Sequence, residues 1–183
     1  RLNQASRKLK MIIQFEKDGI VIYHNGDPFN DDDFIAITTY GRSTKKQLSN
    51  FNRIGKFGIG FRSVFGITDA PEIHSNDFHF VIRDFELLET IDPIDIMEPF
   101  TTLFRFPFKK NISFTDLWDR VRAWDYRFIL FLDYINKIEI INNVTNEKFF
   151  IKRINTDDSK IVILSTNMTD DFVNEKYLVI SKI

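Results

Sequence analysis

Alternating apolar residues mark the first elements of the chain. Met11–Glu16 and Ile20–His24 carry apolar side chains at short intervals and are separated by Lys17-Asp18-Gly19. An Asp-Gly pair between two such runs is typical of a hairpin, because it supplies the positive φ angles of a tight turn. These two runs therefore predict a pair of antiparallel strands.

A short helix is predicted after this hairpin. Asn30 precedes the three aspartates 31–33. Clustered carboxylates can bind Mg²⁺ or Ca²⁺, but adjacent aspartates rarely converge on one ion. An Asn cap followed by an acidic first turn explains them better. We expect the helix to end near Gly41 and to pack three apolar residues inward, namely Phe34, Ile35 and Ile37.

The second half of the chain predicts a longer amphipathic helix and a small sheet. Ser113, with Asp116 three residues later, forms a capping signal. Apolar residues then recur at intervals of three and four, which predicts a helix of about 20 residues that ends near Asn136; they are Phe114, Leu117, Val121, Trp124, Phe128, Leu132 and Ile135. Strands are predicted afterwards at residues 137–142, 148–153, 160–165 and 177–181.

Three glycines stand immediately before another apolar run that predicts a helix. Gly55, Gly58 and Gly60 admit positive φ angles and place no Cβ between the backbone amides and a ligand. The start of a helix adds unpaired N–H groups, so this pattern predicts a phosphate-binding loop, with a tight structural loop as the alternative. No Gly-Lys-Ser/Thr triplet completes a Walker loop, and no acidic residue at the required distance supports a Rossmann fold.

Basic and polar residues fill the stretch before these glycines. Arg42, Lys45, Lys46, Arg53 and Lys56 could contact phosphate or form a solvated face. The stretch 47–53 is polar without apolar periodicity, which predicts a mobile loop.

Composition limits the class of protein to which this chain can belong. The chain has 183 residues, 43% of them apolar, which suffices for one domain and part of a second. Its net charge of −1 gives no signal for nucleic acid. The absence of cysteine excludes disulfides and thiolate chemistry, and no apolar run is long enough to span a membrane. The 20 phenylalanines recur in strand-like runs, which indicates core packing rather than stacking on bases.

The segment GKFGIGFRSVFGITDAPEIHS, residues 55–75, resembles the second glycine box of the GHKL ATPases, a superfamily that includes gyrase, histidine kinases and a heat-shock chaperone. Its longer form is most similar to the sacsin-like branch. Three further segments resemble family boxes in the same order, namely residues 24–29, 41–45 and 101–108.

This resemblance implies a fold and a domain division. The fold is an α/β two-layer sandwich, with a mixed and mainly antiparallel sheet and helices on one face (the Bergerat ATP-binding fold), followed by a small α+β segment. Residues 1–110 correspond to the ATP-binding domain without its N-terminal helix. Residues 111–183 correspond to the start of a transducer-like or middle-like segment.

The resemblance also implies which residues meet the nucleotide. The family's adenine-reading aspartate falls on His24 or Asn25, depending on a one-residue register choice, and neither carries the charge of a carboxylate. Thr102 is expected to reach the base from the closing strand while Thr101 points away. The remaining expected ligand residues are Gly26, Ser43, Lys45, Gly55, Lys56, Phe57, Gly58, Ile59 and Gly60.

The implied function is ATP binding and hydrolysis in a cytoplasmic and chaperone-like protein. Closure of the ATP lid, which the resemblance places at residues 42–54, would drive conformational change in adjoining domains. In the family, the catalytic glutamate and the Mg²⁺-binding asparagine lie on a helix that would precede Arg1. The alternative is a regulatory module that binds nucleotide without turnover. A histidine-kinase-like phosphotransferase is a further rival, although none of the three histidines lies on a predicted dimerisation helix. Expected partners are further domains, a protein client or a second copy of the chain.

Overall fold

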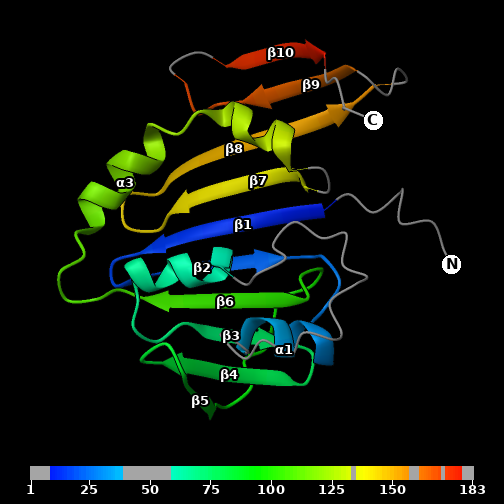
Figure 1. Ribbon diagram of the computed structural model, residues 1–183. Coiled ribbons are helices and arrows are strands. Elements are labelled where there is room, and N and C mark those ends of the chain that lie inside the picture. The colour runs from blue at the N-terminus through cyan, green and yellow to red at the C-terminus, as the bar shows by residue number, and fades with distance from the viewer. Residues whose placement is uncertain (1–8, 39–58, 133–134, 157–160, 170–171, 179–183) are drawn as a thin grey trace, which may run out of the picture.

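The computed structural model describes residues 9–38, 59–132, 135–156, 161–169 and 172–178. The strands within these ranges are β1 (Leu9–Glu16), β2 (Gly19–His24), β3 (Glu72–Ser75), β4 (Phe78–Arg83), β5 (Leu87–Thr90), β6 (Thr102–Pro107), β7 (Ile135–Asn142), β8 (Glu147–Asn155), β9 (Ile161–Thr166) and β10 (Val173–Leu178). They form one sheet in the order β10-β9-β8-β7-β1-β2-β6-β3-β4-β5 (Figure 1).

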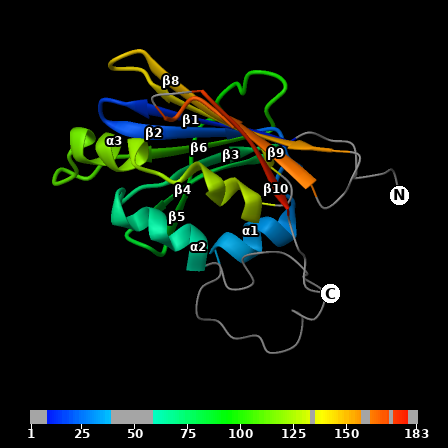
Figure 2. The ribbon, with the colours of Figure 1, turned by 90° about the horizontal axis from the view of Figure 1, so that it is seen from above.

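The helical segments lie on one face of this sheet, as the view from above shows (Figure 2). They are α1 (Asp31–Thr38), α2 (Ile59–Arg62), η2 (Ser63–Gly66), α3 (Phe114–Arg122) and η3 (Tyr126–Phe131), where η denotes a 3₁₀ helix. Because all described strand pairs except β1–β7 are antiparallel, the predicted class of a mixed, mainly antiparallel two-layer α/β fold is confirmed.

The predicted first hairpin is present, but its turn differs from the expectation. Glu16 pairs with Gly19, and neither Asp18 nor Gly19 has a positive φ angle. The prediction of positive φ was therefore wrong. Glycine is needed at position 19 for space, because a Cβ there would lie 2.9 Å from the carbonyl oxygen of Phe106 on the neighbouring strand.

One parallel strand pair joins the two halves of the chain. β1 pairs with β7, with Met11 opposite Ile138 and Phe15 opposite Asn142. The main core crosses the same junction, because Phe15 packs edge-on against Trp118 of α3 with ring centroids 5.3 Å apart. The division into segments 1–110 and 111–183 stays a prediction, and the two segments share a sheet and a core.

The acidic turn begins a helix, as predicted. The side-chain oxygen of Asn30 accepts a hydrogen bond from the Asp33 amide at 2.9 Å, and the Asp33 carboxylate accepts one from the Asn30 amide at 3.3 Å. This reciprocal pair caps α1. Phe34 and Ile37 pack on the sheet as expected, whereas Ile35 is 55% exposed, which corrects the prediction that it points inward.

The predicted helix of residues 113–136 is broken into two. Ser113 caps α3 by accepting a hydrogen bond from the Asp116 amide at 3.2 Å, as expected. The chain then turns at Asp125, whose extended backbone and carboxylate cap the separate helix η3 through the Arg127 amide at 3.0 Å. The signal for this break was Asp125, a second capping residue within the amphipathic pattern. The break leaves Trp124 exposed.

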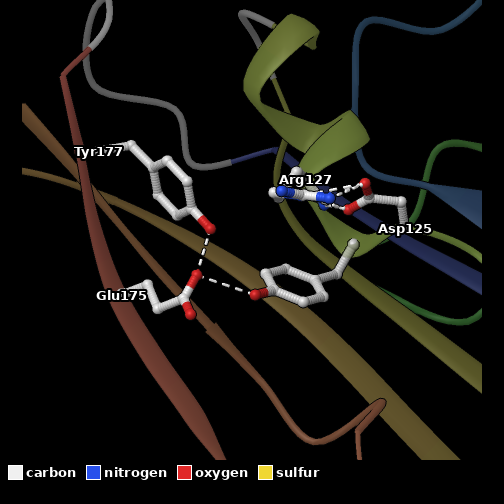
Figure 3. A network of polar contacts seen from close by, with 5 residues as sticks. Asp125, Arg127, Glu175 and Tyr177 are labelled. Atoms are coloured by element: carbon white, nitrogen blue, oxygen red, sulfur yellow. Dashed lines mark hydrogen bonds and ion pairs between the residues drawn. The ribbon is translucent and has the colours of Figure 1, made fainter.

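The cap of η3 belongs to a polar network that reaches the last strand (Figure 3). Arg127 forms a two-pronged ion pair with Asp125, which holds the pKa of that carboxyl below its usual range. Beside it, Glu175 of β10 accepts hydrogen bonds from Tyr126, at 2.8 Å, and from Tyr177. The network therefore fastens η3 to the edge strand of the sheet.

The strands after η3 follow the predicted order with shifted ends. β7, β8 and β9 overlap their predicted ranges closely, whereas β10 begins at Val173 instead of Tyr177. No helix among the described residues is long and apolar enough to cross a membrane.

Candidate functional site

Only part of the predicted site lies within the described residues. His24, Asn25, Gly26 and Thr102 are described in full, and Ile59 and Gly60 as backbone in α2. The other predicted ligand residues lie outside the described ranges; they are Ser43, Lys45, Gly55, Lys56, Phe57 and Gly58. The predicted lid loop, residues 42–54, lies outside them as well.

Strand register brings three polar side chains to the same face of the sheet. Thr102, at the start of β6, is opposite His24 of β2 on one side and Ser75 of β3 on the other. Paired residues of neighbouring strands share a face. Phe104, two residues after Thr102, contacts the Phe61 ring of α2, so this is the face that carries the helices.

Ser75 and Thr102 form a closed hydrogen-bond network. The Ser75 hydroxyl accepts from the Phe29 amide at 2.9 Å and donates to the Thr101 carbonyl at 3.2 Å. Because a hydroxyl has a single proton, Thr102 is the donor in the 2.6 Å contact between the two hydroxyls. Both side chains are fully buried. Ser75 was not among the predicted site residues, and the signal for it was its position at the end of a strand inside the glycine-box segment.

His24 is held as a neutral ring by the backbone that follows it. Its Nδ1 accepts a hydrogen bond from the Gly26 amide at 3.1 Å. Burial lowers the pKa of His24 below its ordinary value. A Cβ on residue 26 would lie 3.1 Å from the same Nδ1 atom, so a glycine at this position permits the close approach.

Asn25 forms hydrogen bonds with the neighbouring strand β1. Its side-chain oxygen accepts a hydrogen bond from the Lys10 amide at 2.7 Å, and its own amide donates to the Lys10 carbonyl at 3.3 Å. These bonds extend the β1–β2 pairing beyond His24. Of the two candidates for the base-reading position, His24 is the one whose ring lies beside Phe104 on the helix face, with ring centroids 5.9 Å apart.

Thr101 anchors the segment that follows His24. Its hydroxyl donates to the Gly26 carbonyl at 2.6 Å, and its amide donates to the His24 carbonyl at 3.0 Å. The loop after β2 is therefore tied to the start of β6, and the side chain of Thr101 is used for backbone support.

The predicted helix after the glycine segment is present and short. It begins at Ile59, directly after Gly58, but it is one α turn followed by the 3₁₀ turn η2. A single turn has little dipole, so any phosphate contact would depend mainly on the loop amides. Phe65 of η2 stacks on Phe85 at 4.4 Å, and this stacking fixes the far end of the segment against the β4–β5 turn.

A shallow cleft opens on the helix face between α1, the α2–η2 segment and the β4–β5 turn. It is lined mainly by apolar side chains, including Ile37, Phe61, Phe65, Ile82 and Phe85. None of the predicted site residues that the structure describes in full lines this cleft.

The other two histidines lie on the opposite face of the sheet. His74 and His79 face each other across β3 and β4 with their Nδ1 atoms 3.1 Å apart. His74 is fully buried, and burial together with the charges of His79 and Arg105 lowers its pKa.

The described residues do not supply a metal centre. No group of three or more histidine and carboxylate side chains comes together within the described ranges. The Mg²⁺ that the resemblance implies stays a prediction.

Comparison with known proteins finds one family model and two curated relatives that agree with each other. Residues 3–90 match the family model of the Sacsin domain. The protein NO VEIN of Arabidopsis thaliana is 51% identical over 65 residues, and human Sacsin is 46% identical over 54 residues. These alignments cover 36% and 30% of the chain but only 2% and 1% of those proteins, so the chain spans a small part of the curated relatives that it matches.

A solved structure with a distant likeness is the topoisomerase IV ATP-binding domain of Francisella tularensis in complex with a small-molecule inhibitor. The likeness covers 77% of this chain and 74% of that one, at 18% identity and a TM-score of 0.42. At that distance it assigns no function.

Proposed function

Residues 3–90 of this chain belong to the Sacsin domain family, and on that premise we propose that the chain is a nucleotide-binding module. The nucleotide would lie on the helix face of the sheet, against the ends of β2, β6 and β3. The observation that carries this proposal is the convergence of His24, Ser75 and Thr102 on that face, within the segment pattern that resembles the GHKL boxes.

The base end of the proposed site is built from His24, Gly26 and the buried Thr102. Phe104 contacts both the His24 ring and Phe29, with centroids 5.9 and 6.0 Å apart, and offers the apolar wall that a base needs. Asn25 supports this end through its bonds to Lys10.

The phosphate end is assigned to the glycine segment that leads into α2. The amides of residues 55–60 would surround the phosphates, with Ser43, Lys45 and Lys56 as hydroxyl and charge partners. ATP is the ligand that the family resemblance implies. Water would cleave its terminal phosphoanhydride bond to give ADP and phosphate, and turnover coupled to closure of residues 42–54 is the further step of the proposal. A module that binds nucleotide without turnover is the alternative.

Calorimetry with ATP and ADP on the 183-residue chain tests the proposal. Gly58→Val should abolish binding, because its side chain would project into the space where phosphate meets backbone. Gly66→Val is the matched control, since a side chain at residue 66 would enter open space. Equal affinity of the parent and Gly58→Val would remove the glycine segment from the site, and no binding by a folded parent would refute the proposed function.

A further inference from the structure

The free ring nitrogen of His24 carries a proton. The backbone amide of Gly26 can only donate, so Nδ1 of His24 is the acceptor in their 3.1 Å hydrogen bond. A neutral imidazole with Nδ1 as acceptor has its hydrogen on Nε2. The tautomer is thus fixed by a bond that the chain makes with itself.

The charged form of this ring is disfavoured by the same geometry. A proton on Nδ1 would point at the Gly26 N–H and break that hydrogen bond. Burial also lowers the pKa of His24, so the ring is neutral near pH 7. The group that His24 offers is therefore a single N–H donor at Nε2, with no acceptor atom left on the ring.

This donor is available on the helix face. Strand register places His24 beside Thr102, and its ring contacts Phe104. Nε2 makes no hydrogen bond with any residue in the described ranges. The Thr102 proton is already used on Ser75, so it does not alter the donor character of His24.

We propose that the base site of this module prefers a purine with an oxygen at C6, as in guanine and hypoxanthine, over adenine. The inference rests on the proposed function, which places the base at His24. The adenine 6-amino group only donates, so it would meet a second donor at Nε2. A 6-oxo group accepts, and the two form a hydrogen bond.

Inosine triphosphate and ATP are the matched probes, because both carry the same ribose and phosphates. They differ at C6 and in the proton on N1, so calorimetric affinities for the 183-residue chain isolate the base edge. One neutral hydrogen bond predicts that inosine triphosphate binds more tightly by a factor of about 2 to 12.

Two variants at residue 24 separate donor chemistry from shape. Asn and Asp can both accept the Gly26 amide in the manner of an Asx turn. His24→Asn then presents an NH₂ donor to the base and should keep the preference for inosine triphosphate. His24→Asp presents a second acceptor oxygen of nearly the same shape and should reverse the preference towards ATP.

The possible results distinguish a failure of the base preference from a failure of the proposed function. Tighter binding of ATP by the parent would mean that the Nε2 N–H donates a hydrogen bond to N1 of adenine. This result would overturn the C6 preference, while the proposed function would stand. The same ratio of affinities in the Asn and Asp variants would also overturn it, because His24 would then not read the base. Binding of neither triphosphate by a folded parent chain would refute the proposed function, and the base preference with it.

Discussion

The chemistry of His24 is set by the two residues that follow it. Gly26 brings its amide within 3.1 Å of Nδ1, and the absence of a Cβ at residue 26 permits this approach. The pattern His-Asn-Gly predicted a polar position at the end of a strand, but it left open whether His24 or Asn25 faces the site. In the structure the Asn25 side-chain oxygen accepts the Lys10 amide, whereas the His24 ring lies beside Phe104 on the helix face.

Thr102 offers a test at the same scale. Thr102→Val keeps the shape of the side chain and deletes the hydroxyl that donates to Ser75 in a fully buried contact of 2.6 Å. We expect the free energy of unfolding to fall by about 0.5–1.5 kcal/mol. Urea denaturation followed by circular dichroism measures this change, and an unchanged midpoint would show that the Ser75–Thr102 bond adds no stability.

At the scale of elements, signals between residues a few positions apart predicted the structure correctly. Patterns over longer stretches of the chain did not. The caps at Asn30 and Ser113 each depend on residues three positions apart, so both were readable from the sequence. The helix predicted after Ser113 was wrong because the apolar spacing continues through Asp125, where the backbone turns. The parallel pairing of β1 with β7 joins residues far apart in the chain, and no local pattern encodes it.

The hairpin between β1 and β2 gives a prediction about close packing. Gly19→Ala would place a Cβ 2.9 Å from the Phe106 carbonyl oxygen, so β2 and β6 would have to separate. Overpacking of this kind costs about 1–3 kcal/mol, and we expect a loss of unfolding free energy in that range. Gly66→Ala is the control, because a Cβ there meets nothing within 4 Å and should leave stability unchanged or slightly raised. Equal melting temperatures for the two variants would contradict the close approach.

At the scale of the whole molecule, one sheet carries two chemically different faces. The helix face holds His24 and the proposed site, whereas the opposite face buries His74 against His79. Both His24 and His74 have lowered pKa values, chiefly because burial disfavours the charged imidazole. The sequence showed only that none of the three histidines lies on a predicted dimerisation helix, and the strand register then showed which face each one occupies.

These two histidines predict how stability depends on pH. Their pKa is near 6.5 in an unfolded chain and lower in the folded protein, so the unfolded state binds more protons as pH falls. The stability that they contribute is complete above pH 6.5 and is lost as pH falls from there towards the folded pKa values. Urea titrations at several pH values measure this slope, and His74→Gln should flatten it. A slope over this window that is identical in the parent and in His74→Gln would exclude His74 as a source.

The most direct test of the central claim is amide hydrogen exchange of the 183-residue chain with and without a bound nucleoside triphosphate. The account predicts slower exchange on binding at residues 24–29 and 42–60, where base and phosphates are assigned, and unchanged exchange in β8, β9 and β10. Unchanged exchange at residues 24–29 and 42–60, or slowing confined to the last three strands, while calorimetry records binding, would contradict the proposed site.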